Sequence, residues 1–188
     1  MRLVILGGSG SGKSTQAQRL CRTFDIPQIS TGEILREAIA SLSNLGRHAE
    51  PYVQKGELVP DEMMIALIKM WLKKIDTNSG WLLEGYPRTA FQAEELDFLL
   101  DYLGKKLDWA IYLQVPEAVM VNRCLGRSLP DEQPEIVQRR IELFYDRTIP
   151  ILEYYDRRRL LLTINGDQLP QMVEQNIMNL LSVPEHNT

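Results

Sequence analysis

The sequence contains few of the residues that build disulfide frameworks or structural zinc sites. Only two cysteines occur among 188 residues, Cys21 and Cys124, and they form no CxxC pair. The two histidines, His48 and His186, stand in polar stretches and are expected at the surface. The composition therefore excludes a disulfide scaffold and a Cys/His zinc module, and it fits a reducing, cytoplasmic setting.

An excess of positive charge and long apolar runs are also missing. The formal net charge is −4, and general nucleic-acid binding requires clustered Lys and Arg. The apolar run at the start is too short for a signal peptide, and no stretch approaches the roughly 18 apolar residues of a membrane span. We therefore expect a cytoplasmic protein, a monomer, with neither nucleic acid nor a membrane as partner.

Short apolar runs bounded by turn residues predict buried parallel strands. Four such runs occupy residues 3–6, 81–83, 109–113 and 160–164, and a weaker one occupies 27–30. Helical periodicity falls between them, most clearly at 61–75, where apolar residues recur every three or four positions. This alternation predicts an α/β fold of three layers, with a five-stranded parallel sheet in a single domain covering residues 1–188.

One region departs from the alternation of strand and helix. Two helix-like stretches, 32–42 and 46–56, follow the weak strand without a strong strand between them. A small helical lobe inserted into the sheet domain explains this pattern.

The glycine-rich stretch "GGSGSGKS" at residues 7–14 follows the first predicted strand and precedes a helical pattern. It satisfies G-x-x-x-x-G-K-[ST] in the context that this motif requires. Its backbone N–H groups and helix N-terminus form an anion site, Lys13 can reach the β- and γ-phosphates, and the Ser14 hydroxyl can ligate Mg²⁺. The expected ligand is a nucleoside triphosphate, which by itself does not separate a kinase from a GTPase, an ATPase or a sensor.

Residues farther along supply groups for a second phosphate. Glu84 ends a predicted strand, where a parallel sheet presents ligand-facing groups, and can hold a water of the Mg²⁺ shell. Arg36, at the start of the inserted lobe, and Arg88, after the turn that follows Glu84, can form a bidentate clamp for another phosphate.

Two later helical patterns carry further arginines. Arg123 and Arg127 are four residues apart and share a helix face. In the next helix Arg140 lies beside the apolar seam and can point toward a site, whereas Arg139 is predicted to point to water. Pro150 is expected to interrupt this helix.

Phosphoryl transfer between two nucleotides is the reaction that such a set of cations suits. Charge spreads over the oxygens of the transferring group, so catalysis consists of positioning with several cations around the phosphates. Lys13, Arg88, Arg127 and Arg140 would be the catalytic cations, together with Mg²⁺.

The ordered series of motifs resembles the adenylate kinases of the nucleoside monophosphate kinase family. The resemblance runs from residue 1 to about 166, through "GGSGSGKSTQAQRL", "PQISTGEILREA", "KGELVPDEM", "LLEGYPRTAFQAEEL", "VNRCLGR" and "INGD". It implies reversible, Mg²⁺-dependent phosphoryl transfer from ATP to AMP, giving two ADP.

The resemblance also implies which residues bind each nucleotide. Residues 30–59 would be the AMP-binding insertion, and the Gln92 amide would pair with adenine. The implied AMP-binding residues are Thr31, Arg36, Glu57, Leu58, Val59, Gly85, Arg88, Gln92 and Arg140. The implied ATP-binding residues are Gly8, Ser9, Gly10, Ser11, Gly12, Lys13, Ser14, Thr15, Arg123, Arg127 and Gln168, with Ser14 and Glu84 at the metal.

Several positions depart from the usual family pattern. Serines stand at 9, 11 and 14 where proline, alanine and glycine are usual, and Glu33 and Glu84 replace aspartates. The segment 127–134 predicts a very short lid, with Leu129 in place of a usual arginine before the pair Asp131 and Glu132. Because lid closure excludes water, the ATP site is expected to be less enclosed.

Two alternatives remain open at the level of sequence. One is a P-loop kinase for another acceptor, such as CMP, UMP or a small alcohol, although an alcohol has no phosphate for Arg36 and Arg88. The other is a catalytically idle nucleotide-binding regulator. A sensor needs affinity for its nucleotide, however, and does not need several cations placed to stabilise a transition state.

Overall fold

The computed structural model of the chain describes residues 1–74, 79–127 and 132–182. Its five strands form one parallel sheet in the order β2–β3–β1–β4–β5, as the sequence predicts. The strands are β1 (Arg2–Leu6), β2 (Gln28–Ser30), β3 (Trp81–Glu84), β4 (Trp109–Gln114) and β5 (Leu161–Asn165). Each lies within one or two residues of a predicted run.

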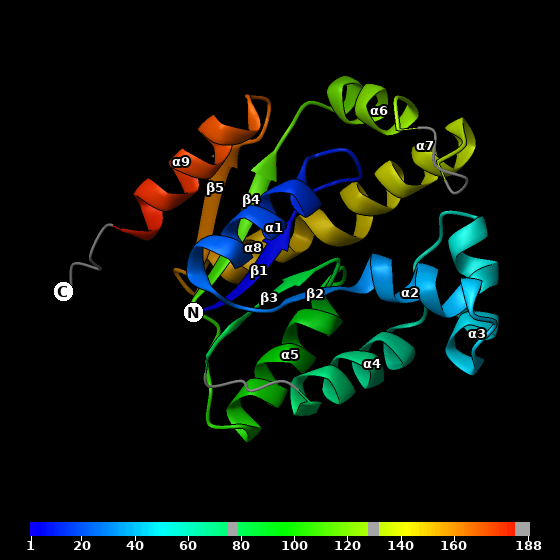
Figure 1. Cartoon of the computed structure of the whole chain (residues 1–188), viewed down its shortest axis with the longest axis horizontal. Coiled ribbons are helices and arrows are strands. Elements are labelled where there is room, and N and C mark those ends of the chain that lie inside the picture. Colours follow the sequence, from blue (N-terminus) through cyan, green and yellow to red (C-terminus); the bar gives the residue numbers. More distant parts are fainter. Residues whose placement is uncertain (75–78, 128–131, 183–188) are drawn as a thin grey trace.

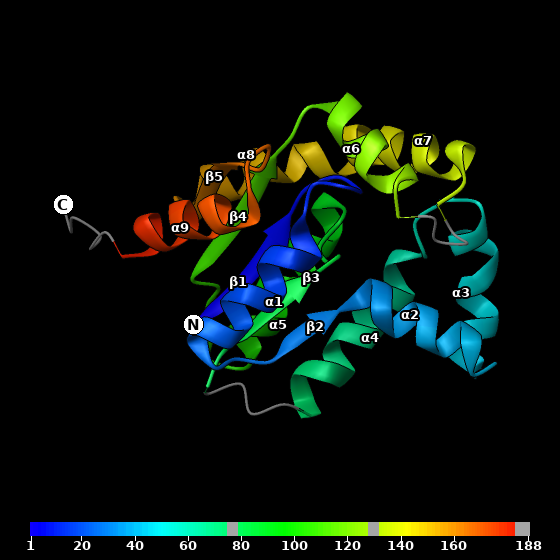
Figure 2. The same cartoon turned by 45° about the horizontal axis from the view of Figure 1, so that its top comes forward.

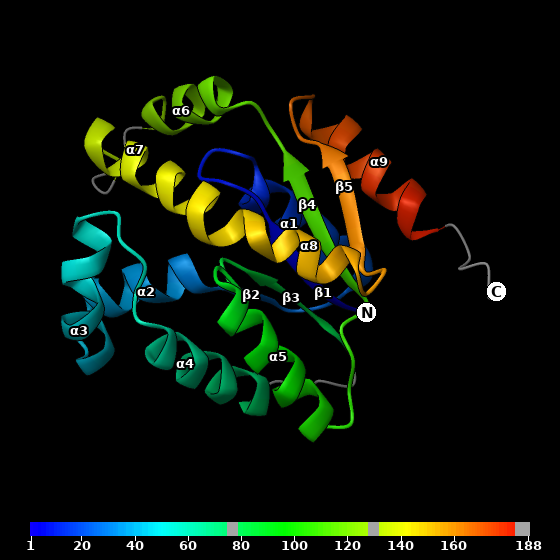
Figure 3. The same ribbon diagram turned by 180° about the vertical axis from the view of Figure 1, so that it is seen from behind.

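Helices cover both faces of the sheet, which gives the expected three layers (Figures 1 and 3). Along β1, Leu3 and Ile5 share one apolar cluster with α1 and α9, while Val4 and Leu6 share the other with α4, α5 and α8. Successive strand residues point to opposite faces, so this apolar strand is buried on both sides. The helices are α1 (Lys13–Phe24), α4 (Asp61–Lys74), α5 (Ala90–Tyr102), α8 (Ile149–Asp156) and α9 (Pro170–Leu181).

The inserted lobe consists of α2 (Thr31–Ala40) and α3 (Asn44–Gln54). Both helices project from one end of the sheet and pack against each other (Figure 2). Ser30 and Ser43 cap them by accepting hydrogen bonds from backbone amides of the first turns. The two predicted helical stretches are therefore confirmed.

Across from this lobe, at the same end of the sheet, lie α6 (Glu117–Leu125) and α7 (Pro134–Leu143) (Figure 1). A single π-helical turn at Phe144–Thr148 follows α7 and leads into α8. Pro150 falls in the first turn of α8, where the missing proline N–H is tolerated. The regular α-helical pattern thus gives way to a π turn just before Pro150, although the chain stays helical from Pro134 to Asp156.

Both cysteines are free, and His48 is exposed, as expected. Among the described residues, no helix is both long enough and apolar enough to cross a membrane. Residues 128–131, which include the predicted lid positions Leu129 and Asp131, lie outside the described chain, and so does His186.

Candidate active site

The glycine-rich loop joins the end of β1 to the start of α1. Gly12 has a φ of +94° and caps α1 without a side chain, so the first-turn N–H groups stay open to an anion. The Lys13 amine lies across this loop and donates hydrogen bonds of 2.7 Å to the carbonyl oxygens of Gly7 and of Gly8. Burial lowers the pKa of Lys13 to about 8, against the opposing effect of Glu84. A bound phosphate would favour the charged amine.

A carboxylate from β3 faces this loop. β1 and β3 are neighbours, with Ile5 opposite Glu84, so the Glu84 side chain lies next to the start of α1. The Ser14 hydroxyl donates to one Glu84 carboxylate oxygen, and Gln28 Nε2 donates to the other at 2.9 Å. Glu84 is 7% exposed. Both of its oxygens are therefore oriented before any ligand arrives.

One pocket opens between the loop, the inserted lobe and the region of α7, where Glu132 precedes the helix and Arg140 lies in its last turn. Four predicted catalytic cations, drawn from four segments of the chain, line it together. They are Lys13, Arg88, Arg127 and Arg140. The other predicted nucleotide or metal residues that line it are Ser9, Gly10, Gly12, Ser14, Thr15, Thr31, Arg36, Glu57, Leu58, Val59, Glu84, Gly85 and Gln92.

The turn after β3 holds Arg88 in place. Gly85 has a φ of +83°, and a Cβ atom there would collide with the Thr31 hydroxyl, so this close approach requires glycine. Thr31 Oγ1 donates to the Glu84 carbonyl at 3.2 Å, and Arg88 Nε donates to the Gly85 carbonyl at 3.0 Å. Burial lowers the pKa of Arg88, and the nearby Arg140 adds to this effect. Two cations held so close together favour an anion between them.

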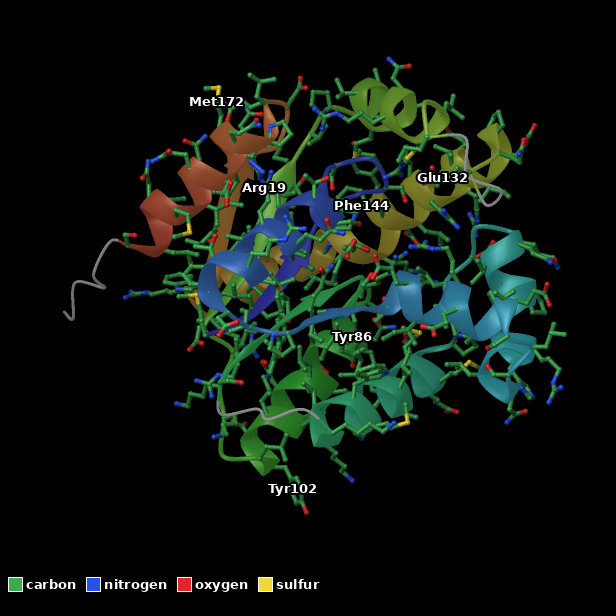
Figure 4. The ribbon with its side chains drawn as sticks, in the orientation of Figure 1. Arg19, Tyr86, Tyr102, Glu132, Phe144 and Met172 are labelled. Carbon is green, nitrogen blue, oxygen red and sulfur yellow. The ribbon has the colours of Figure 1, made fainter. Side chains whose placement is uncertain are left out.

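Arg127 and Glu132 form an ion pair at the α7 side of the pocket. Arg127 Nε donates to Glu132 Oε2 at 3.1 Å, and Nη2 donates to Oε1. Burial lowers the pKa of Arg127, but its hydrogen bonds to Glu132 outweigh burial and the pKa is raised. Figure 4 labels Glu132 near the start of α7, above α2 and α3 in that view.

Arg139 is 42% exposed, in keeping with the prediction that it points to water, but it also has a partner that the sequence did not predict. Arg139 Nε donates to Glu57 Oε1 at 2.7 Å, so it connects α7 to the segment that leads out of the inserted lobe. The helical wheel described the position relative to α7 correctly, but it carries no information about a lobe that folds back over that helix.

Four predicted ATP-binding residues do not line this pocket. Gly8 lines a smaller adjoining cavity, and Ser11 is buried with an unpaired hydroxyl oxygen. Arg123 donates to the Gly166 carbonyl at 3.1 Å and pairs with Asp167 at 3.2 Å. Gln168 accepts a hydrogen bond from Asn176 at 2.8 Å.

Sequence reasoning missed three residues that orient predicted site residues. Gln28 fixes Glu84, Glu132 fixes Arg127, and Asp61 accepts a 2.7 Å hydrogen bond from Gln92 Nε2. Asp61 had a simpler explanation as a first-turn acid of a helix. Gln28 is the first residue of a three-residue strand, whereas ligands gather at the carboxyl ends of parallel strands, so no sequence signal singled it out.

The fold and the loop define a P-loop nucleotide-binding protein. The sequence model of the adenylate kinases matches residues 5–160. The chain is 79% identical to "Adenylate kinase 2" of Nostoc sp. over 97% of this chain and all of that protein. It is 55% identical to "Adenylate kinase 2" of Synechocystis sp., over 92% of this chain and 98% of that protein.

A more distant relative differs in length. "Adenylate kinase" of Caldicellulosiruptor bescii is 35% identical, and the alignment runs over 214 residues while covering 97% of this 188-residue chain and all of that protein. That relative therefore has residues that this chain lacks.

The chain belongs to the adenylate kinase family, whose reaction is the reversible transfer of a phosphoryl group from ATP to AMP, giving two ADP. The resemblance read from the motifs is confirmed. A different phosphoryl acceptor and an idle regulator, the two alternatives, are not supported.

Proposed function

We propose that the pocket binds ATP on the side of the glycine-rich loop and AMP on the side of the inserted lobe, and transfers the phosphoryl group between them. The observation that carries this proposal is the meeting of Lys13, Arg88, Arg127 and Arg140 in one pocket from four separate segments. The phosphoryl group carries negative charge while it is transferred between the two nucleotides, and cations around it stabilise that charge.

AMP occupies the part of the pocket lined by the inserted lobe and by the turn after β3. Arg36 and Arg88 bind its phosphate, and Gln92 binds the edge of its base. Thr31, Gly85 and the segment at 57–59 form the walls. The lobe at residues 30–59 thus serves as the AMP-binding insertion.

ATP lies with its phosphates in the loop at residues 8–15. The open N–H groups at the start of α1 and the Lys13 amine hold the β- and γ-phosphates. Arg127 and Arg140 contact the phosphates from the α7 side. Arg123 and Gln168, outside the pocket, flank the adenine of ATP.

The donor set suits Mg²⁺ carried with the nucleotide. Mg²⁺ prefers oxygen ligands and keeps several waters, with one or two carboxylates and substrate phosphates completing its shell. The Ser14 hydroxyl and the Glu84 carboxylate, both facing the pocket, would hold it, Glu84 through water. Among the described residues no cluster of three His, Cys, Asp or Glu side chains could hold a metal alone. The ion would neutralise phosphate charge during transfer.

We further propose that the protein acts as a cytoplasmic monomer. Every catalytic cation comes from one chain, so no second copy is needed to complete the pocket. Size-exclusion chromatography with light scattering tests this, and a dimer at micromolar concentration would contradict it.

A coupled assay tests the acceptor. ATP and Mg²⁺ are supplied with AMP, CMP, UMP, GMP or no acceptor in separate reactions, and nucleotide products are quantified. We expect rapid turnover with AMP alone. Comparable rates with CMP or UMP would overturn the assignment of the base site, and rates independent of any acceptor would overturn the two-nucleotide arrangement.

A further inference from the structure

The Gln92 amide is held at both of its ends. Gln92 lines the pocket, and the residue is only 2% exposed. Its Oε1 accepts a hydrogen bond of 2.7 Å from the Arg88 backbone N–H, and its Nε2 donates one of 2.7 Å to Asp61 Oδ1. The chemistry of these partners fixes which end of the amide is oxygen and which is nitrogen.

The reversed amide would lose both hydrogen bonds. Its NH₂ group would face the Arg88 N–H, donor against donor, and its oxygen would face the Asp61 carboxylate, acceptor against acceptor. A buried polar group facing a group of its own kind is costly, because desolvation is not compensated. One orientation is therefore strongly favoured before any nucleotide binds.

Asp61 is itself held in position by the start of α5. The Thr89 hydroxyl donates to Asp61 Oδ1 at 3.2 Å and accepts from the Gln92 backbone N–H, also at 3.2 Å, as the N-cap of that helix. The Tyr86 hydroxyl donates to the Gln92 backbone carbonyl at 3.1 Å. Figure 4 labels Tyr86 near the start of α5. The backbone and the side chain of Gln92 are thus both fixed.

The oriented amide keeps one free lone pair on Oε1 and one free N–H on Nε2. Adenine presents an amino donor at position 6 and an acceptor at N1, which match this pair. Hypoxanthine and guanine present an acceptor at O6 and a donor at N1, which match only the reversed amide.

We propose that Asp61 is a specificity-determining residue that makes the acceptor site select adenine over 6-oxopurines by fixing the orientation of the Gln92 amide. The inference rests on the proposed placement of AMP beside Gln92. Asp61 acts through Gln92 and is a positioning residue, since the pocket is lined by Gln92 and not by Asp61.

The test compares AMP with IMP, which carries the 6-oxopurine edge without further substituents. The kcat/KM for each acceptor is measured with Mg²⁺ and ATP in the wild type, Asp61→Asn, Asp61→Ala and Gln92→Ala. Asparagine keeps the size of the side chain but can donate to a reversed amide as well as accept. Glu62→Gln is the matched control, because Glu62 is an exposed carboxylate in the same helix turn. Thermal melts establish that each variant is folded.

We expect the AMP/IMP ratio of kcat/KM to fall about tenfold in both Asp61 variants, within the range for one bidentate base contact, and to stay unchanged in Glu62→Gln. In a Gln92→Ala background, Asp61→Asn should leave the ratio unchanged. An equal loss with AMP and with IMP, or a fall in the ratio of less than threefold, would overturn the proposal. If Gln92→Ala itself leaves the ratio at its wild-type value, the placement of AMP is what fails; if only the Asp61 variants leave it there, the orienting role alone fails.

Discussion

On the AMP side of the pocket, the carboxylate that orients a site residue lies behind the pocket lining, whereas on the ATP side the orienting carboxylate lines the pocket itself. Gln92 and Arg88 are fixed through Asp61, Gly85 and the cap of α5. Arg127 is fixed by Glu132, a carboxylate that lines the same pocket as the expected phosphates.

The two arrangements differ in how much the side chains must rearrange when a nucleotide binds. The hydrogen bonds that orient Gln92 leave one lone pair and one N–H of its amide available, so the proposed AMP site is organised before AMP binds. The Arg127–Glu132 pair keeps a negative charge beside the proposed site of the ATP phosphates, so this side would combine positioning with repulsion. The variants below test each side in turn.

Removal of Arg88 is expected to have the largest effect, because this residue faces both halves of the pocket. Arg88→Ala should lower kcat about 100- to 1000-fold in steady-state assays, the usual loss for a preorganised group that stabilises transition-state charge. The melting temperature should change little, since the substitution removes a hydrogen bond to the Gly85 carbonyl but also relieves the repulsion between Arg88 and Arg140.

Arg88→Lys is the informative companion. Lysine keeps the charge but not the planar fork, so activity should lie between those of the wild type and Arg88→Ala. Turnover at the wild-type rate in Arg88→Ala would contradict the role of Arg88 at the transferring phosphate.

The next effect concerns Gln28, which orients Glu84. Gln28→Leu removes a hydrogen bond to a buried carboxylate, and such bonds contribute about 1.5–3 kcal/mol. The free Mg²⁺ concentration for half-maximal activity should therefore rise about tenfold. Calorimetric binding of a non-hydrolysable ATP analogue should weaken with Mg²⁺ present and not in its absence.

Gln54→Leu controls for loss of a glutamine, because Gln54 pairs with Glu50 on the exposed face of α3. In a Glu84→Gln background, Gln28→Leu should add nothing to the loss. Equal additional losses in both backgrounds would show that Gln28 does not act through Glu84.

A substitution of Glu132 tests whether this carboxylate mainly positions Arg127 or mainly repels the phosphates of ATP. If positioning dominates, as the pair of hydrogen bonds to one edge of Arg127 leads us to expect, Glu132→Gln should raise the KM for ATP about fivefold and leave the KM for AMP unchanged. Glu135→Gln, an exposed change in the first turn of α7, is the control. A lower KM for ATP in Glu132→Gln would mean that repulsion dominates.

The sequence alone predicts the sheet and the loop because both depend on local signals. Apolar runs locate the five strands to within one or two residues, and the motif at residues 7–14 specifies its own chemistry. The arginines could be predicted as a set because phosphoryl transfer needs cations.

Contacts between distant segments could not be predicted in this way. Asp61 lies 31 residues from Gln92, and Glu57 lies 82 residues from Arg139, and no periodicity relates the members of either pair. The helical wheel assigned Arg139 to solvent because it treats α7 alone. Only the folded chain shows that the inserted lobe brings an acid to that face.

The contact between Arg139 and Glu57 is expected to have the smallest effect and is the most direct test of whether the two sides of the pocket are coupled. It joins α7, on the ATP side, to the segment that lines the AMP side. Both side chains are at least about a third exposed, and exposed ion pairs stabilise little.

Glu57→Gln should therefore raise the KM for AMP about twofold at low ionic strength, because the inserted lobe is then held less closely to α7. The difference from the wild type should vanish at about 0.5 M KCl, where charges are screened over a few ångström. Glu142→Gln is the matched control, because Glu142 contacts the same arginine from within α7 and should leave the KM for AMP unchanged. Equal changes in the KM for AMP in Glu57→Gln and Glu142→Gln would show that the contact between Arg139 and Glu57 does not couple the two sides of the pocket.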